Sequence, residues 1–181
     1  MRAVERPLVD LPAPPDDNLA MDQYDDRKDT ALAGKLVEII ETRAGGIARA
    51  WYRDVKESSY TPSFKHISEK DALEIVNNVY RKLGYWLHPD SEHEVRDTYE
   101  IFGQSMYHKG LQMEEVVMTL VLIKRYLWLH LLEEGLMTTD LAIYQALELN
   151  NKVVLYFDRA IYFALRGYRE ARARARTAAA S

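Results

Sequence analysis

The sequence predicts an all-α domain. Apolar residues recur at helical spacing along most of the chain after residue 28, and no sustained alternation or Asn-Gly turn signals a strand. Hydrophobic residues make up 48% of the 181 residues, enough for a core without metals or staples. The chain has no cysteine, which excludes disulfide frameworks, thiolate metal sites and cysteine nucleophiles.

Charge and hydropathy argue against nucleic acid and membranes as binding partners. The net charge of −4 gives no indication of nucleic-acid binding. Residues 1–11 carry proline and charges where a signal peptide would have an apolar run. The longest apolar stretch, residues 116–123, is far too short to span a bilayer. We therefore expect a cytoplasmic protein that binds neither nucleic acid nor membrane.

Composition divides the chain into three parts. Residues 1–28 hold Pro7, Pro12, Pro14 and Pro15 with several aspartates, a composition typical of a flexible tail. Residues 29–168 carry the helical periodicity and form the expected domain. Residues 169–181 alternate arginine with alanine, both strong helix formers, and we expect a solvated basic helical extension or tail there. A basic tail that binds acidic surfaces or RNA is a weaker alternative.

The first expected helix begins at Asp29, a suitable N-cap, and ends before Pro62. Gly45-Gly46 is expected to weaken or bend it. A second amphipathic helix follows Ser68, which forms a capping box with Asp71, and runs to Leu87.

Three further helices are expected. Ser91 and Glu94 form a capping box for a helix that ends near Lys109, where Gly110 is a C-terminal stop. The most apolar helix spans 113–134 and is closed by Gly135. Thr138 or Thr139 caps the last helix, which continues past residue 166. Five to six helices in about 150 residues match the size of a globin-like fold or a compact bundle.

No catalytic motif is visible. The sequence lacks G-x-S-x-G, G-x-G-x-x-G, the Walker A pattern and the Glu-x-x-His pairs of di-iron bundles. His88 and His93 bracket a turn that contains Asp90 and Glu92, but a solvated turn is favoured there over a metal site. We expect no enzyme activity and no metal.

Two polar residues fall among apolar ones. Lys124 lies within the predicted apolar arc of its helix, either as the counter-charge of a bound carboxylate or with its stem packed and its amine reaching solvent. Asn150 lies within the arc of the last helix, where its amide either fixes helix register or lines a pocket.

The last helix is apolar on more than one side. Tyr144 and Tyr162 lie opposite the main arc, and Tyr156 lies between the two sides. Aromatic enrichment is typical of protein interfaces, so these tyrosines are the predicted dimer interface. A central core helix is the alternative, with about equal weight.

Short motifs recur in order along residues 30–170. They are Ala48-Arg49-Ala50-Trp51-Tyr52, the loop with Pro62 and Ser68, Leu83-Gly84-Tyr85-Trp86-Leu87, Phe102-Gly103, Lys109-Gly110-Leu111 with Glu114-Glu115-Val116, Leu127-Trp128 and Ala164-Leu165-Arg166-Gly167-Tyr168. In this order they resemble the N-terminal sensory domain of RsbRD-type stressosome co-antagonists and, more distantly, globin-coupled sensor domains.

The resemblance implies a globin-like, usually dimeric domain that senses an input and passes it to a C-terminal partner. Haem-binding relatives need an axial histidine on the helix before the Gly-Leu step. The buried side of that helix here offers Phe102 and Met106, whereas His108 points away. This departure indicates a non-haem domain. No output domain is present, so the signal would pass through dimerisation or a separate signalling protein.

The leading hypothesis is therefore a non-haem, dimeric sensory domain without a cofactor. It would bind a small apolar or acidic ligand near Lys124, Trp128 and Asn150, and Phe102 and Met106 are further candidate ligand-binding residues. One alternative is a haem sensor that uses His108 or His130. Another is a ligand-free helical adaptor whose tyrosine-rich last helix binds a partner.

Overall fold

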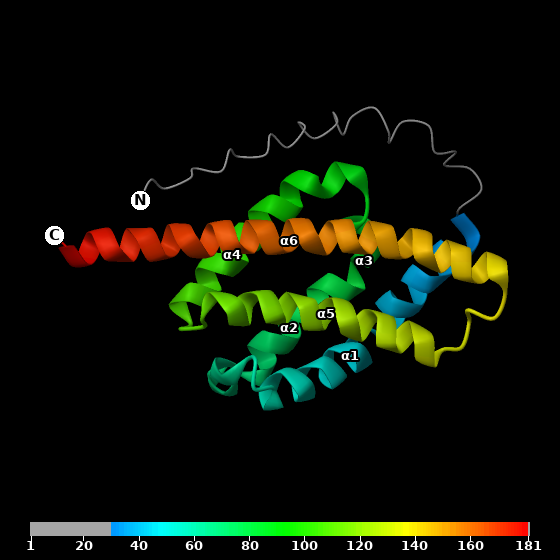
Figure 1. The fold of residues 1–181 in the computed structure, drawn as a ribbon, viewed down its shortest axis with the longest axis horizontal. Coiled ribbons are helices and arrows are strands. Elements are labelled where there is room, and N and C mark those ends of the chain that lie inside the picture. The colour runs from blue at the N-terminus through cyan, green and yellow to red at the C-terminus, as the bar shows by residue number, and fades with distance from the viewer. Residues whose placement is uncertain (1–29, 181) are drawn as a thin grey trace, which may run out of the picture.

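The computed structural model describes residues 30–180, and the all-α prediction is confirmed for them (Figure 1). The expected tail over 1–28 and the Asp29 cap lie outside these residues. The elements are α1 (Thr30–Glu57), the 3-10 helix η1 (Pro62–His66), α2 (Glu69–Arg81), α3 (Leu83–Trp86), the 3-10 helix η2 (Pro89–Ser91), α4 (Glu92–His108), α5 (Met113–Glu133) and α6 (Asp140–Ala180).

Helix α1 continues through Gly45 and Gly46 without interruption. Its buried side supplies Leu36, Ile40 and Trp51 to the core, and this packing outweighs the low helix propensity of glycine. After the helix ends, the Thr61 hydroxyl donates a hydrogen bond to the carbonyl of Val55 at 2.5 Å. This contact folds the chain back towards α2.

The second predicted helix is divided in two. The Ser68 side chain accepts a hydrogen bond from the Asp71 amide at 3.1 Å, so the predicted cap is confirmed. The helical backbone stops at Lys82, with φ −124° and ψ 26°, and α3 begins at the next residue. The apolar side continues across the break, because Leu83 and Trp86 are both buried.

The predicted Ser91 cap does not form. Ser91 itself has helical φ and ψ, and its hydroxyl donates to the carbonyls of Trp86 at 3.0 Å and His88 at 2.7 Å. The two glycine stops are confirmed, with φ of 81° at Gly110 and 63° at Gly135.

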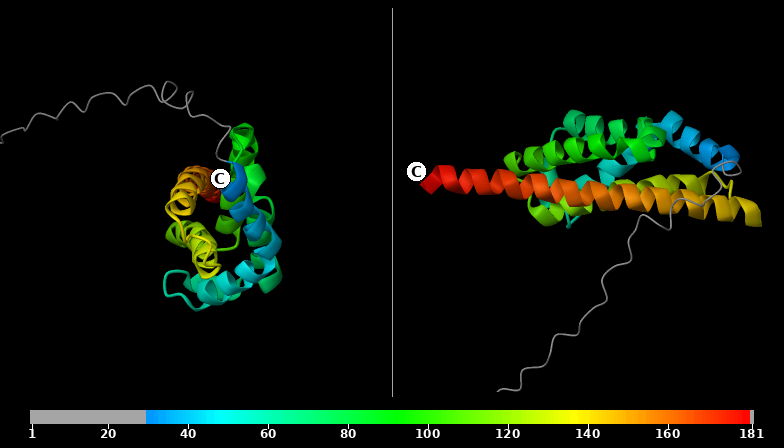
Figure 2. Two further views of the ribbon diagram at one scale, coloured as in Figure 1. Left: turned by 90° about the vertical axis from the view of Figure 1, so that its right-hand side faces the viewer. Right: turned by 90° about the horizontal axis from the view of Figure 1, so that it is seen from above.

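Helix α6 is 41 residues long and crosses the whole molecule (Figures 1 and 2). The Thr139 hydroxyl accepts a hydrogen bond from the Ala142 amide at 3.1 Å, which confirms Thr139 as the cap. The helix continues to Ala180, and its C-terminal end projects beyond the other helices. No helix among residues 30–180 is both long and apolar enough to cross a membrane.

The closest helix contact is the crossing of α4 with α6. A Cβ added at Gly103 would stand 1.9 Å from the carbonyl oxygen of Ala164, and one added at Gly167 would stand 2.0 Å from that of Glu100. Only hydrogen fits at either position, so the glycines bring the two backbones together. The close crossing determines which side chains of α4 and α6 face each other and which face away.

Candidate ligand and interaction sites

Tyr156 lies in the core, not in a dimer interface. It is 3% exposed, its hydroxyl is 2.5 Å from that of Tyr99, and its ring stacks on Trp86 with a centroid distance of 6.3 Å. Burial raises the pKa of both tyrosines, so both phenols stay protonated. The prediction for Tyr156 is therefore wrong, because this side of α6 faces α3 and α4.

Tyr144 and Tyr162, the other predicted interface residues, are 50% and 63% exposed. Leu147 and Leu155 share their side of α6, at spacings that align residues along one helix face. Most of the large apolar side chains that remain exposed in residues 30–180 lie on α6 or on α5 beside it. We call the following set the α5–α6 apolar face: Leu129, Leu132, Tyr144, Leu147, Leu155 and Tyr162.

Lys124 lies at the edge of the buried side of α5. The core stripe of α5 contains Leu120, Ile123 and Leu127, so the predicted arc centred on Lys124 is wrong. The Lys124 side chain is 25% exposed, and its amine is 3.8 Å from a carboxylate oxygen of Asp158 on α6. It therefore has a loose ion pair rather than an isolated buried charge.

Trp128 and Asn150 are both half-buried, one on α5 and the other on α6. The indole N–H of Trp128 is buried and has no hydrogen-bond acceptor among the described residues. A buried donor without an acceptor costs about 1–3 kcal/mol, so this N–H is available to a ligand or a water.

Phe102 and Met106 lie in the buried stripe of α4 with Val95 and Tyr99, and the predicted inner side of this helix is confirmed. The Phe102 ring meets Tyr99 edge to face at 6.0 Å between centroids. Both side chains pack against neighbouring residues in the core. Neither lines one of the three hollows described below.

The two alternative haem ligands lie on different helices, His108 on α4 and His130 on α5. His108 is exposed at the end of α4, beside the Tyr107 ring. The His130 side chain is 18% exposed on α5, with ring nitrogens 3.9 Å from Glu133 and 3.7 Å from Glu134. Neither histidine lines one of the three hollows described below.

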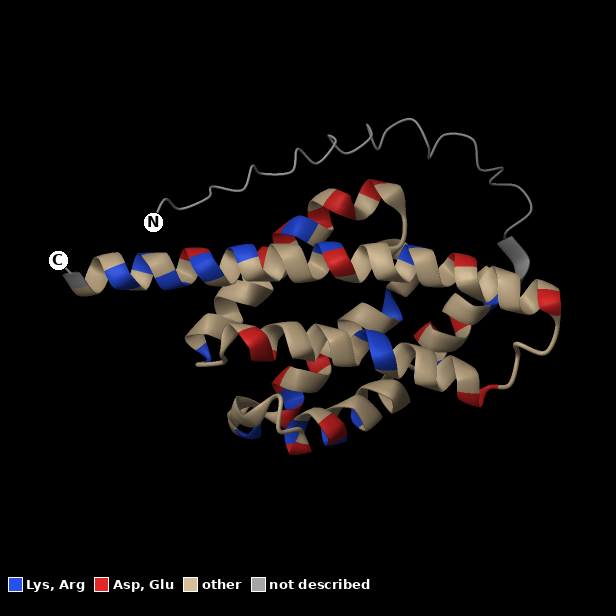
Figure 3. Cartoon of the chain, in the orientation of Figure 1, with Lys and Arg blue, Asp and Glu red and all other residues tan. Residues whose placement is uncertain are grey.

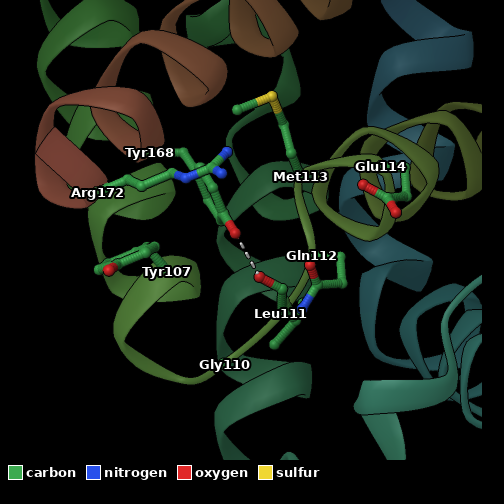
Figure 4. A pocket seen from close by; sticks show the side chains of 8 residues that line it. All are labelled: Tyr107, Gly110, Leu111, Gln112, Met113, Glu114, Tyr168 and Arg172. Atoms are coloured by element: carbon green, nitrogen blue, oxygen red, sulfur yellow. Dashed lines mark hydrogen bonds between the residues drawn. The ribbon is translucent and has the colours of Figure 1, made fainter. Parts of the chain in front are cut away.

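Three of the hollows on the described surface lie at different parts of the fold. The first, about 270 Å³, lies between the α4–α5 turn and α6, where the Tyr168 hydroxyl donates to the Leu111 carbonyl at 2.8 Å (Figure 4). The second follows the arginines near the end of α6. The third, about 1050 Å³, follows α1. None of the predicted ligand residues lines any of these three hollows, and the ligand site stays a prediction.

No group of three or more His, Cys, Asp or Glu side chains in residues 30–180 is placed to hold a metal ion. His88 and His93 each contact an aspartate of their own turn or helix: His88 lies 3.4 Å from Asp90 and His93 lies 3.2 Å from Asp97. The two predicted turn histidines are thus exposed and locally paired.

Sequence reasoning missed the buried carboxylate of Glu115. Glu115 is 2% exposed, and it accepts hydrogen bonds from the backbone amides of Ser63 and Gln112, each at 2.7 Å. It joins η1 to the start of α5 and acts as a structural tie rather than a catalytic acid. The available signal was a glutamate in the first turn of an apolar helix.

Comparison with known families gives one match. The model described as "RsbT co-antagonist protein rsbRD N-terminal domain" matches residues 46–181, from the second half of α1 to the end of α6. No curated protein and no solved structure matches the chain. The matched segment includes Gly103 and Gly167, the two glycines at the crossing of α4 and α6. The match agrees with the family that the short sequence motifs resemble. The chain belongs to the rsbRD N-terminal domain family of RsbT co-antagonists.

Proposed function

We propose that this chain is a non-catalytic, cytoplasmic regulatory domain that works as a homodimer in stressosome signalling and passes its input to a separate signalling protein. Membership of an RsbT co-antagonist family supports the regulatory part of the proposal. The α5–α6 apolar face carries the dimer part. Soluble monomers seldom expose many large apolar side chains together, and such patches mark interaction sites.

The exposed tyrosines and leucines of this face suit a symmetric contact. Tyr162 and Leu155 are 63% and 40% exposed near the middle of α6, and Leu132 is 63% exposed on α5. Aromatic residues are enriched in interface cores because they bury large areas at low cost in side-chain entropy. Two copies that pair α5 and α6 would bury these residues in a four-helix contact.

The dimer is tested by light scattering after size exclusion. We expect a mass of about twice 21.0 kDa for the chain as it stands. The double substitution Leu155→Arg and Tyr162→Arg should raise the dimer dissociation constant about 100-fold or more, because each large apolar side chain contributes roughly 1.5–3 kcal/mol on burial.

The matched control is Ile101→Arg, which changes an apolar side chain that is 66% exposed on α4, away from the α5–α6 apolar face. It should leave the mass unchanged. A chain that is monomeric before any substitution, or a double variant that remains as dimeric as the Ile101→Arg control, would contradict the proposal.

A small acidic ligand is the second part of the proposed function. Its support is the indole N–H of Trp128, which has no acceptor among residues 30–180, together with the Lys124 amine, which is 3.8 Å from the 62% exposed carboxylate of Asp158. An N–H donor and a cation within one stretch of α5 would recognise a carboxylate. The positions of His108 and His130 favour this non-haem reading over the haem alternative.

Native mass spectrometry and an absorption spectrum of protein from haem-replete cells test the ligand. We expect no Soret band and one small co-purified mass, which Lys124→Met should remove and Lys152→Met, a change at an exposed lysine of α6, should retain. A Soret band with one haem per chain would establish the haem alternative. A clean dimer without added mass would favour the ligand-free adaptor.

A further inference from the structure

A groove along α1 has a basic lining that the proposed function does not use. It is the third hollow, of about 1050 Å³, at the lower edge of Figure 1, where the C-terminal half of α1 meets η1 and α2. Gly46 and Ala50 are small residues along it, and the Tyr52 ring adds an apolar wall. We call it the basic groove, lined by Gly46, Arg49, Ala50, Tyr52, Arg53, Lys56, Glu57, Lys65 and Glu69.

The cations of the basic groove outnumber its carboxylates and are unpaired. Arg49, Arg53, Lys56 and Lys65 are all exposed, and none forms an ion pair with another residue in 30–180. Lys56 contacts only a ring, with its amine 5.6 Å from the Tyr52 centroid. Cations gathered around a concave surface attract a segment of opposite charge.

The chain itself contains a segment of that charge. Residues 8–17 read Leu-Val-Asp-Leu-Pro-Ala-Pro-Pro-Asp-Asp, with Asp10, Asp16 and Asp17 and no cation. The next cation along the sequence is Arg27. The segment's three prolines, Pro12, Pro14 and Pro15, lack the backbone N–H that a helix requires, so its composition suits an extended ligand of a groove. The segment lies outside the family match over residues 46–181.

Chain length permits the contact. From Thr30 to Gly46, α1 rises about 24 Å, and from Thr30 to Lys56 about 39 Å, at 1.5 Å per residue. An extended chain spans about 3.4 Å per residue, so Asp17 reaches about 44 Å from Thr30. Asp26 reaches only about 14 Å, which is too short. Residues 8–17, rather than the aspartates next to α1, are therefore the ones that can lie beside Arg49, Arg53 and Lys56.

We propose that residues 8–17 of this chain occupy the basic groove, with Asp16 and Asp17 beside Arg49 and Arg53 and with Asp10 towards Lys65. The contact places the carboxylates of the segment against the cations of the groove. The contact goes beyond the proposed function, because it needs neither the dimer nor the ligand. Charge complementarity makes it sensitive to salt.

The basic end of α6 is the rival surface (Figure 3). The second hollow lies there, but all of its lining residues belong to α6, and one of its arginines, Arg166, already pairs with Glu100 at 3.0 Å. The basic groove instead draws its lining from three elements, α1, η1 and α2, and its four cations have no ion pair among residues 30–180. The groove is therefore the better match.

Engineered cysteines test the contact, since the chain has none of its own. In the full chain, Ala13→Cys with Ala50→Cys should form a disulfide within one chain under mild oxidation. The matched control pairs Ala13→Cys with Ala173→Cys on α6 and should not crosslink. The Ala13–Ala50 yield should fall at least fivefold at high salt, and similarly when Arg49→Asp and Arg53→Asp are added, with circular dichroism verifying that each variant is folded.

Charge reversal on the segment completes the test. Asp16→Arg with Asp17→Arg should lower the crosslink yield, and combining these changes with Arg49→Asp and Arg53→Asp should restore it. A crosslink to position 173 but not to position 50, a crosslink that forms only between two chains, or equal yields in high and low salt would each overturn the proposal. Absence of any crosslink in the folded variant would overturn it too.

Discussion

Replacing Gly103 with alanine is expected to destabilise the folded domain by about 3 kcal/mol or more, at the upper end of the range for overpacking. The added methyl would stand 1.9 Å from the carbonyl oxygen and 2.7 Å from the carbonyl carbon of Ala164. These neighbours are backbone atoms, so relief requires α4 and α6 to separate. Since domains are stable by only about 5–15 kcal/mol, the loss is a large fraction of the total.

The measurement is chemical denaturation followed by circular dichroism, with Gly46→Ala as the matched control. Gly46 lies inside α1 with nothing within 4 Å of an added Cβ, so alanine there should stabilise the domain by about 0.5–1 kcal/mol through helix propensity. A glycine-to-alanine substitution should therefore lower the free energy of unfolding at Gly103 and raise it at Gly46. If Gly103→Ala unfolds at the denaturant concentration of the unsubstituted chain or higher, the close crossing is absent from the protein in solution.

Gly167→Ala provides an independent check on the same crossing, because its added Cβ would stand 2.0 Å from the carbonyl oxygen of Glu100. Both single substitutions separate the same two helices. We therefore expect the double variant to lose less stability than the sum of the two, as is usual for residues in contact.

The helix boundaries were predictable where local chemistry determines them. Gly110 and Gly135 adopt positive φ, which glycine tolerates best, and Ser68 and Thr139 cap helices through their own hydroxyls. Ser91 failed as a predicted cap because the carbonyls of Trp86 and His88 lie within reach of its hydroxyl. That competition depends on how α3 and η2 fold, which periodicity does not reveal.

Side-chain orientation was predictable only on helices with one apolar side. The stripe of α4, with Phe102 and Met106, was correct because polar residues occupy its other side. On α5 about two thirds of the positions are apolar and they occupy more than one side, so the pattern does not fix which side faces inward. The predicted arc was therefore centred on Lys124 instead of Ile123. The basic groove was invisible because Lys65 and Arg53 meet only in the folded chain.

Tyr156→Ala is expected to cost about 3–5 kcal/mol in the free energy of unfolding, the usual loss when a large buried ring is truncated. Truncation removes the stacking partner of Trp86 and the hydroxyl that pairs with Tyr99. Tyr156→Phe retains the ring but leaves the Tyr99 hydroxyl without its partner, so its expected loss is about 1–3 kcal/mol. The pair of substitutions separates the packing of the ring from the hydrogen bond.

Tyr162→Ala is the matched surface substitution on the same helix. Its ring is 63% exposed, so the unfolding free energy of the monomer should change by no more than about 0.5 kcal/mol. Under the dimer proposal this substitution instead weakens assembly, which light scattering measures separately. Substitution of Tyr156 should thus lower the free energy of unfolding, whereas substitution of Tyr162 should weaken dimer association. A Tyr156→Ala variant that keeps its unfolding midpoint but becomes monomeric would place that ring at the interface and remove it from the core.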